Sequence, residues 1–169
     1  MNQVYKIRKN FRFPFVAAVV LLLVLFTICL FTGELWEKIL LGVLSVVSLL
    51  IAVETSEREF VALESGLRIR KFFRTKHFAW PEITHLGLVV LRNKAYFLLT
   101  TTKGFYILSN LLQDHALLIR YLAEKMEAER VETEIRNYLE APIERTSLIV
   151  LTWIALAIIV AIILTKLLK

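Results

Sequence analysis

The stretch "GLRIRKFFRTKHFAW" (Gly66–Trp80) decides the fold prediction because its apolar and charged side chains alternate. Leu67 and Ile69 alternate with Arg68 and Arg70, which is the period-two pattern of a half-buried β-strand. A similar alternation returns after a short turn. The stretch therefore predicts two neighbouring strands of an antiparallel hairpin.

Four further segments have the composition of strands, because they are rich in Val, Ile, Phe, Tyr and Thr. Ser-Gly, Asn-Lys and Lys-Gly pairs separate them, and such pairs favour turns. The segments are "REFVALES" (58–65), "ITHLGLVVLRN" (83–93), "AYFLLTTT" (95–102) and "FYILS" (105–109). Together they predict a meandering antiparallel sheet or barrel.

The period of the apolar residues changes after about Leu111. Apolar side chains then recur every three or four positions, which predicts one amphipathic helix; they are Leu118, Leu122, Met126, Val131, Ile135 and Leu139. Ser109 or Asn110 is expected to cap its start, and Pro142 follows its expected end.

The rest of the chain indicates a membrane protein, since 57% of its 169 residues are hydrophobic. Residues 13–33, 35–53 and 146–165 are apolar over about the 20 residues that a helix needs to cross a bilayer. The first is too long for a signal peptide and lacks a small-x-small cleavage site. Its short link to the second predicts a tight antiparallel helical hairpin.

The distribution of Lys and Arg predicts the orientation. The tail, residues 1–12, contains Lys6, Arg8, Lys9 and Arg12 and no acid, whereas the loop near residue 34 is largely acidic. We expect a multi-pass protein of the inner (cytoplasmic) membrane with the tail in the cytoplasm. Lys166 and Lys169 count weakly against this orientation. The expected parts are a basic cytoplasmic tail (1–12), a transmembrane hairpin (13–54), a cytosolic domain (55–141) and a C-terminal transmembrane helix (142–169).

Several strands followed by one amphipathic helix is the element order of pleckstrin-homology (PH) barrels. The segment "ALESGLRIRKFFRTKHFAWPEITHLGLV" (62–89) resembles bacterial PH-like domains. Such domains typically have a Gly-led strand, a second strand that ends in Trp, and then an acid and an Ile; the matching residues are Gly66, Trp80, Glu82 and Ile83. The resemblance spans roughly residues 58–130. It implies a PH-like barrel or sandwich whose helix closes one end, in a family whose members commonly adjoin transmembrane helices.

Three interpretations compete for the basic and aromatic residues of this hairpin. In the first, the rings and aliphatic side chains face the barrel interior and Arg68, Arg70 and His77 face water, with Trp80 in the core and Glu82 as a turn or capping acid. In the second, the hairpin contacts anionic lipid or a protein partner through Arg68, Arg70, Lys71, Phe72, Phe73, Arg74 and Lys76. Nucleic acid is the third, and it is disfavoured because the helix acids nearly cancel the basic charge and no nucleic-acid-binding motif is present.

The sequence gives little indication of catalysis. His77, His85 and His115 are far apart and have no metal-ligand spacing, and no phosphate-binding glycine loop or paired-carboxylate motif is present. Cys29 lies alone in an apolar segment. We therefore predict a protein that is not an enzyme and has no catalytic residues, metal or cofactor.

The expected function is a non-catalytic, membrane-anchored PH-like interaction or scaffolding module at the cytoplasmic membrane face. Its expected partners are membrane lipids and a protein partner or a second copy, which the edge strands or the open end of the barrel could bind by strand addition. Two alternatives remain. One is a small accessory subunit of a membrane transport or secretion complex, and the other is a membrane enzyme with an unrecognised active site.

Overall fold

The computed structural model describes residues 3–71, 73–92 and 94–168 of the chain, which form two compact units. One unit combines the N-terminal segment through Arg8 with Glu57–Arg145, and we call it the β domain. The other combines Lys9–Ser56 with Thr146–Lys169, and we call it the membrane unit. Each unit is therefore built from separate parts of the sequence.

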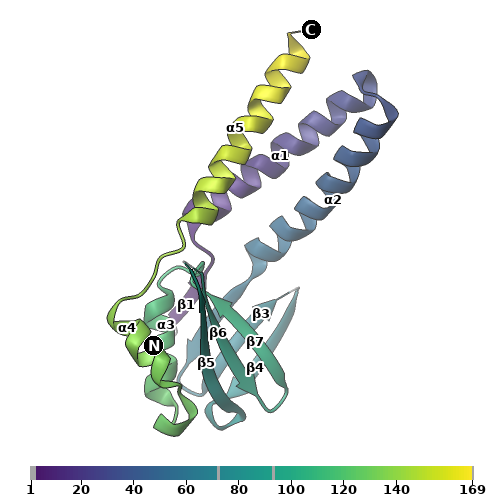
Figure 1. Cartoon of the computed structure of the whole chain (residues 1–169). Helices are drawn as coiled ribbons and strands as arrows, with labels where there is room; N and C mark the ends of the chain where they lie inside the picture. The colour runs from purple at the N-terminus through teal and green to yellow at the C-terminus, as the bar shows by residue number, and fades with distance from the viewer. Residues whose placement is uncertain (1–2, 72, 93, 169) are drawn as a thin grey trace. The chain divides into compact units, whose positions relative to one another are not determined.

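The membrane unit contains three helices that are long and apolar enough to cross a bilayer, as predicted. They are α1 (Lys9–Thr32), α2 (Leu35–Glu57) and α5 (Ser147–Leu167) (Figure 1). At 1.5 Å per residue each is roughly 30 Å long or longer, which matches the hydrocarbon core.

The helical hairpin α1–α2 is less tightly packed than predicted. Gly33 and Glu34 join the two helices, but α1 packs along its length against α5. The short connection fixes only one end of the pair, where the Phe26 ring lies against Gly42. On α1 a row of small and aliphatic side chains is buried instead, comprising Ala18, Val19, Leu22 and Leu25.

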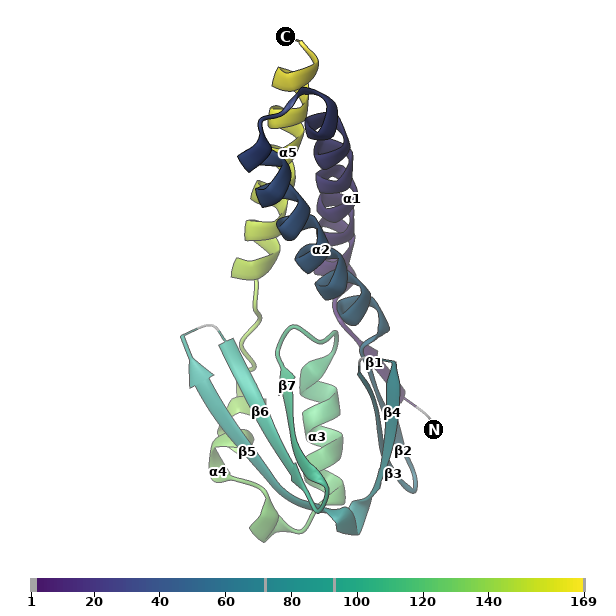
Figure 2. The same cartoon turned by 90° about the vertical axis from the view of Figure 1, so that its right-hand side faces the viewer.

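The β domain contains two antiparallel sheets (Figure 2). The first has the order β1-β2-β3-β4, with β1 (Gln3–Lys6), β2 (Glu59–Leu63), β3 (Gly66–Lys71) and β4 (Arg74–Ala79). The second has the order β5-β6-β7, with β5 (Ile83–Leu91), β6 (Lys94–Thr101) and β7 (Gly104–Ser109). A single 3-10 turn, Trp80–Glu82, links the sheets. The six strands predicted after residue 57 are all present.

Strand β1 was not predicted from the sequence. It pairs antiparallel with β2, and Lys6 lies opposite Glu59. The segment "QVYK" is short and lies beside a cluster of basic residues, so its alternation is hidden. Because β1 and β2 are neighbours in the sheet, helices α1 and α2 are inserted into the connection of a β-hairpin.

The prediction of a single amphipathic helix after Leu111 is wrong, because two helices occupy this region. They are α3 (His115–Lys125) and α4 (Thr133–Glu140), separated by the 3-10 turn Ala128–Arg130. The break is caused by the edge of the second sheet: Val131 forms a parallel bridge with Leu86, and the Glu132 amide donates to the Leu86 carbonyl at 3.1 Å. Pairing with a strand requires extended backbone, which a continuous helix cannot provide.

The predicted caps, Ser109 and Asn110, do not begin a helix. Ser109 ends β7, and Asn110 is fully buried and donates from its side-chain nitrogen to the Ile143 carbonyl at 2.9 Å. The helix starts after Asp114, whose backbone is left-handed with φ 52°.

The core of the β domain is built from both sheets and both helices. Its largest fully buried side chains include Phe60 and Phe78 from the first sheet, Ile83, Leu86 and Phe97 from the second, and Leu118, Leu122 and Ile135 from α3 and α4. Phe78 contacts the ring of Tyr106 across the sheets, with centroids 5.0 Å apart. This shared core fixes the two sheets and the helices relative to one another.

Candidate functional site

The predicted contact residues cluster around the β3–β4 turn. Lys71 lies opposite Arg74 at its base. Phe73 has φ 59° and an exposed fraction of 70%, so its ring projects from the turn. Phe72, the other predicted ring, lies outside the described residues. Among the described residues of this basic turn, Phe73 is the large apolar side chain that is exposed.

One face of the first sheet packs into the core, and the basic side chains of the turn lie on this same face, nearer the turn. Leu67 and Phe78 are cross-strand partners on this face and are exposed by only 1% and 2%. Direct partners point to the same side of a sheet, and so does every second residue of a strand. The next pairs toward the turn are Ile69 with Lys76 and then Lys71 with Arg74. The face thus changes from apolar to basic toward the turn.

Arg68 and Arg70 lie on the opposite face, so the structure divides the predicted contact residues into two groups. Arg70 forms an ion pair with Glu57, and Arg68 is half-buried. This placement agrees with the alternation in the sequence. Lys71, Arg74 and Lys76 form the other group and share one face.

Lys76 joins this group to the second sheet. Its ammonium donates to the Tyr106 hydroxyl at 2.9 Å and lies 5.5 Å from the centroid of the Tyr106 ring. Lys76 belongs to β4 and Tyr106 to β7, so the contact bridges the borders of the two sheets. A cation over an aromatic face is stabilised by the ring quadrupole.

Two cavities adjoin this contact. They have volumes of about 400 and 460 Å³ and share Ile69, Lys71 and Tyr106 in their linings. We call the joined cavities the basic groove. Its basic lining residues are Arg58, Lys71, Arg74, Lys76 and Arg145. Among the described residues that line it, none is Asp or Glu.

Sequence reasoning missed part of this groove. Arg58 and Arg145 lie in the segments next to α2 and α5, and Tyr96 and Tyr106 were assigned only to strands. Arg145 lies 6.0 Å from the centroid of the Tyr96 ring. Only the three-dimensional closure of the domain brings these residues to the β3–β4 hairpin, so no local signal in the sequence indicates them.

The residues of the PH-like motif have structural roles. Ile83 is fully buried, and Gly66 is buried where its neighbour in the sheet leaves no room for a side chain. Trp80, expected in the core, is only half-buried; its indole nitrogen donates to the Glu64 carbonyl at 2.8 Å and its ring meets Tyr121 edge-on. The 3-10 turn that contains Trp80 keeps the ring at the border of the core.

Glu82 acts as a capping acid, as the first interpretation expected. Its carboxylate accepts a hydrogen bond from the Ala79 amide at 2.9 Å and forms an ion pair with Lys103 at 2.5 Å. The hydrogen bond from Lys103 and then the one from Ala79 lower the pKa of the Glu82 carboxyl. This group stabilises the link between the sheets, and it lies outside the basic groove.

A buried polar network holds the segment before α5. His115, exposed by 4%, lies 2.8 Å from the Tyr138 hydroxyl through Nε2, and that hydroxyl donates to the Ile143 carbonyl at 3.0 Å. Because the Tyr138 hydroxyl donates its proton to Ile143, it accepts from the Nε2–H of His115. Nearby, Arg8 forms an ion pair with Glu144 at 3.1 Å. The network connects α3 and α4 to the residues that lead to the last helix.

The stability of the β domain is expected to fall on mild acidification because of His115. Burial, followed by the positive charge of Arg8, lowers the pKa of its imidazole, against the opposing effects of Glu144, Asp114 and the Leu112 carbonyl. The imidazole pKa in the unfolded chain is about 6.5, so below this pH the unfolded chain binds a proton that the folded chain does not. The free energy of unfolding therefore falls by at most about 1.4 kcal/mol per pH unit.

Denaturation of the full chain in detergent at pH 7 and pH 5.5 measures this loss of stability. His115→Gln is expected to reduce this difference, and an unchanged difference would contradict the assignment.

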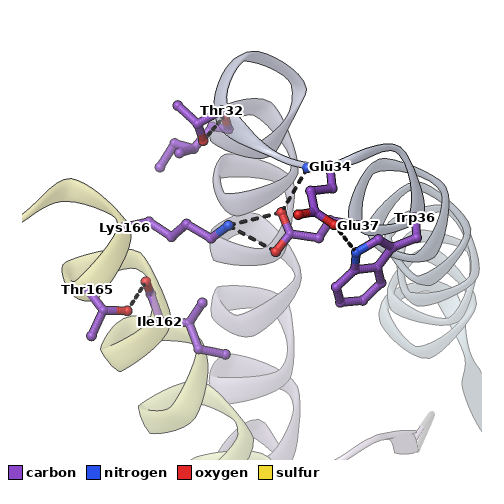
Figure 3. Close-up of polar contacts among 8 residues, drawn as sticks. Thr32, Glu34, Trp36, Glu37, Ile162, Thr165 and Lys166 are labelled. Carbon is purple, nitrogen blue, oxygen red and sulfur yellow. Dashed lines mark hydrogen bonds and ion pairs between the residues drawn. The ribbon is translucent and has the colours of Figure 1, made fainter. Parts of the chain in front are cut away.

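A second polar cluster lies in the membrane unit, at the ends of the helices (Figure 3). Lys166 of α5 contacts both carboxylate oxygens of Glu37 of α2 at 3.0 and 3.1 Å. The Glu34 amide donates to the Glu37 carboxylate at 3.3 Å, and the Trp36 indole donates to Glu34 at 2.7 Å. Lys166, whose charge counted against the predicted orientation, is therefore paired with an acid in the first turn of α2.

The described titratable groups do not assemble a metal centre. Among these residues there is no cluster of three or more His, Cys, Asp and Glu side chains that could hold a metal ion. His85 and Glu132 form a pair at 3.0 Å, in which Glu132 also accepts from the Leu88 amide at 2.8 Å. That pair fastens the start of α4 to β5.

No protein-family model, curated protein or solved structure matches the chain. The fold itself defines the class: an α+β protein with two antiparallel sheets and three helices that are long and apolar enough to cross a membrane. The resemblance to bacterial PH-like domains stays a prediction.

Proposed function

We propose that the protein is a non-catalytic, membrane-anchored interaction module whose PH-like β domain contacts anionic lipid headgroups at the cytoplasmic face of the inner membrane. The observation that carries the proposal is the position of the β3–β4 turn. Lys6, Glu59, Arg70 and Thr75 lie in one row across the four strands of the first sheet. The turn therefore lies at the end of the sheet where β1 leads into α1 and where β2 follows α2.

Chain connectivity keeps this end of the domain near the bilayer surface. Only Ile7 and Arg8 separate β1 from α1, and only Arg58 separates α2 from β2. Two residues span at most about 10 Å between the ordered elements. Each basic residue close to an anionic surface contributes about 1 kcal/mol of attraction, so Lys71 and Arg74 favour contact with headgroups and Phe73 can enter the interface.

A second group of basic residues, at the start of α1, supports the cytoplasmic orientation. Lys9 and Arg12 begin α1, and Lys6 and Arg8 precede them. At the other end of the helices the charges of Glu37 and Lys166 are paired. The excess of positive charge thus lies at the helix ends that are joined in sequence to the β domain, and positive ends of spans remain in the cytoplasm.

The proposal predicts that residue 73 lies at the level of the headgroups. In a Cys29→Ser chain, Phe73→Cys carrying an environment-sensitive fluorophore is expected to be quenched strongly by lipids with nitroxide headgroups. A label at Leu117→Cys, exposed by 56% on α3, serves as the matched control and is expected to be quenched weakly.

The measurement uses the full chain in vesicles with and without anionic lipid. Quenching at residue 73 should increase with anionic lipid, and Lys71→Ser with Arg74→Ser should reduce that increase because about 2 kcal/mol of attraction is lost. Equal quenching at residues 73 and 117, with no dependence on lipid charge, would reject the headgroup contact.

A further inference from the structure

The basic groove lies between two strand borders that pair with no further strand among the described residues. The first sheet ends at β4 and the second at β7, and Figure 2 shows these two strands as the facing borders of the sheets. The Lys76–Tyr106 contact joins them through side chains. A strand border presents main-chain N–H and C=O groups that can pair with another extended chain.

The hydrogen-bond pattern shows which groups of β7 point outward. Thr101 lies opposite Gly104 across a two-residue turn, and the Asn110 amide donates to the Ala95 carbonyl at 3.1 Å. Hydrogen-bonded pairs alternate along an antiparallel ladder, so the even-numbered residues of β7 pair with β6. The main-chain groups of Phe105 and Ile107 consequently face the open border.

A contact already present at this border supports the assignment. The Arg58 guanidinium donates to the Ile107 carbonyl at 2.6 Å. This carbonyl therefore points away from β6 and accepts a hydrogen bond at the place where an added strand would donate one. Arg58 occupies the position of that donor.

The side chains of β7 also favour an extended occupant. Phe105 and Ile107 lie two residues apart, on one face of the strand, and are exposed by 79% and 51%. Such exposed apolar side chains on a strand border indicate a binding surface. A small anion bound at the basic residues would leave both uncovered, whereas a strand laid along β7 would cover them.

We propose that the basic groove binds an acidic, extended peptide segment of a protein partner, which adds as a strand to β7. Its main chain would pair with Phe105 and Ile107, as in other cases of strand addition, and would displace the Arg58 guanidinium from the Ile107 carbonyl toward the acidic side chains of the peptide. Its acidic side chains would face Arg58, Lys76 and Arg145 of the groove, which contains no acid among its described lining residues, while Lys71 and Arg74 at the turn remain available to the headgroups. The inference names the partner of the interaction module and rests on that proposed function.

The test uses the full chain in nanodiscs of zwitterionic lipid, so that lipid charge plays no part. The probe is a fluorescent eight-residue peptide of alternating Glu and Val, and binding is measured by anisotropy. Saturable binding is expected. Arg58→Glu with Arg145→Glu should weaken it at least tenfold, whereas the matched control, Arg120→Glu with Arg136→Glu on the exposed surfaces of α3 and α4, should leave it unchanged.

A second peptide tests strand addition itself. Methylation of alternate main-chain nitrogens removes the donors that would pair with β7 and keeps every charge, so we expect at least a tenfold loss of affinity. Equal binding of the methylated peptide would overturn strand addition. Absence of saturable binding, or equal binding of an alternating Lys and Val peptide, would overturn the proposal, while the quenching at residue 73 would still report on lipid contact independently.

Discussion

A soluble β domain is expected to fold when residues 9–56 are replaced by a short loop and the chain ends at Arg145, but not when the chain simply begins at Glu57. The loop would rejoin β1 and β2, which are antiparallel neighbours with Lys6 opposite Glu59. A hairpin connection of about four residues suffices for such a pair. The shorter chain lacks β1 entirely.

The cost of losing β1 is large relative to the stability of a small domain. Tyr5 and Ile7 are exposed by only 5% and 8%, and full burial of such side chains contributes about 1.5–3 kcal/mol each. The hydrogen bonds between β1 and β2 add about 1 kcal/mol apiece. The sum, about 5 kcal/mol or more, is comparable to the whole stability of a typical domain, about 5–15 kcal/mol.

Circular dichroism and denaturant titration measure this difference. The rejoined chain should unfold cooperatively, and within it Tyr5→Ala should be strongly destabilising. Val4→Ala in the same strand is the matched control, because Val4 is 53% exposed. A chain beginning at Glu57 that is as stable as the rejoined chain would show that β1 is dispensable.

The sequence predicted the elements with regular patterns. Leu67 and Ile69 alternate with Arg68 and Arg70, and in the structure the first pair is buried and the second lies on the opposite face. The three apolar segments are helices of spanning length for an equally direct reason, since each is apolar over nearly its whole length. Local patterns of this kind need no knowledge of distant residues.

The features that were not predicted depend on distant pairing. Strand β1 forms because β2 offers a partner more than 50 residues away, and the predicted single helix is broken because Val131 pairs with Leu86. The helical period around Val131 was correct as a pattern, but strand pairing overrode it.

The candidate site was predicted only in part for the same reason. The basic hairpin is visible in the sequence as "RKFFRTK" (70–76), and its register separates Lys71, Arg74 and Lys76 from the other basic residues. Arg58 and Arg145 enter the groove only through the closure of the domain. Residue types near segment ends give no indication of such a position.

Gly66→Ala is expected to be among the most destabilising single substitutions in the β domain. The backbone at Gly66 has φ 156°, and a Cβ atom there would lie 1.9 Å from the Phe78 carbonyl oxygen. Neither β3 nor β4 can move away without breaking the ladder between them. Backbone strain of about 1–3 kcal/mol and a steric cost of similar size predict a loss of roughly 3–5 kcal/mol.

Gly104→Ala is the matched control that separates these two contributions. Gly104 also has a positive φ, 127°, but no atom lies within 4 Å of the place where its Cβ would be. Its substitution should therefore cost only the backbone strain, about 1–3 kcal/mol. Denaturant titration of both variants in the rejoined soluble domain gives the difference, which measures the contact with Phe78. Equal losses of unfolding free energy in the two variants would contradict this steric contribution. They would mean that β3 and β4 can move apart at Gly66 and accommodate the added methyl group without disturbing the strand pairing on which the basic hairpin depends.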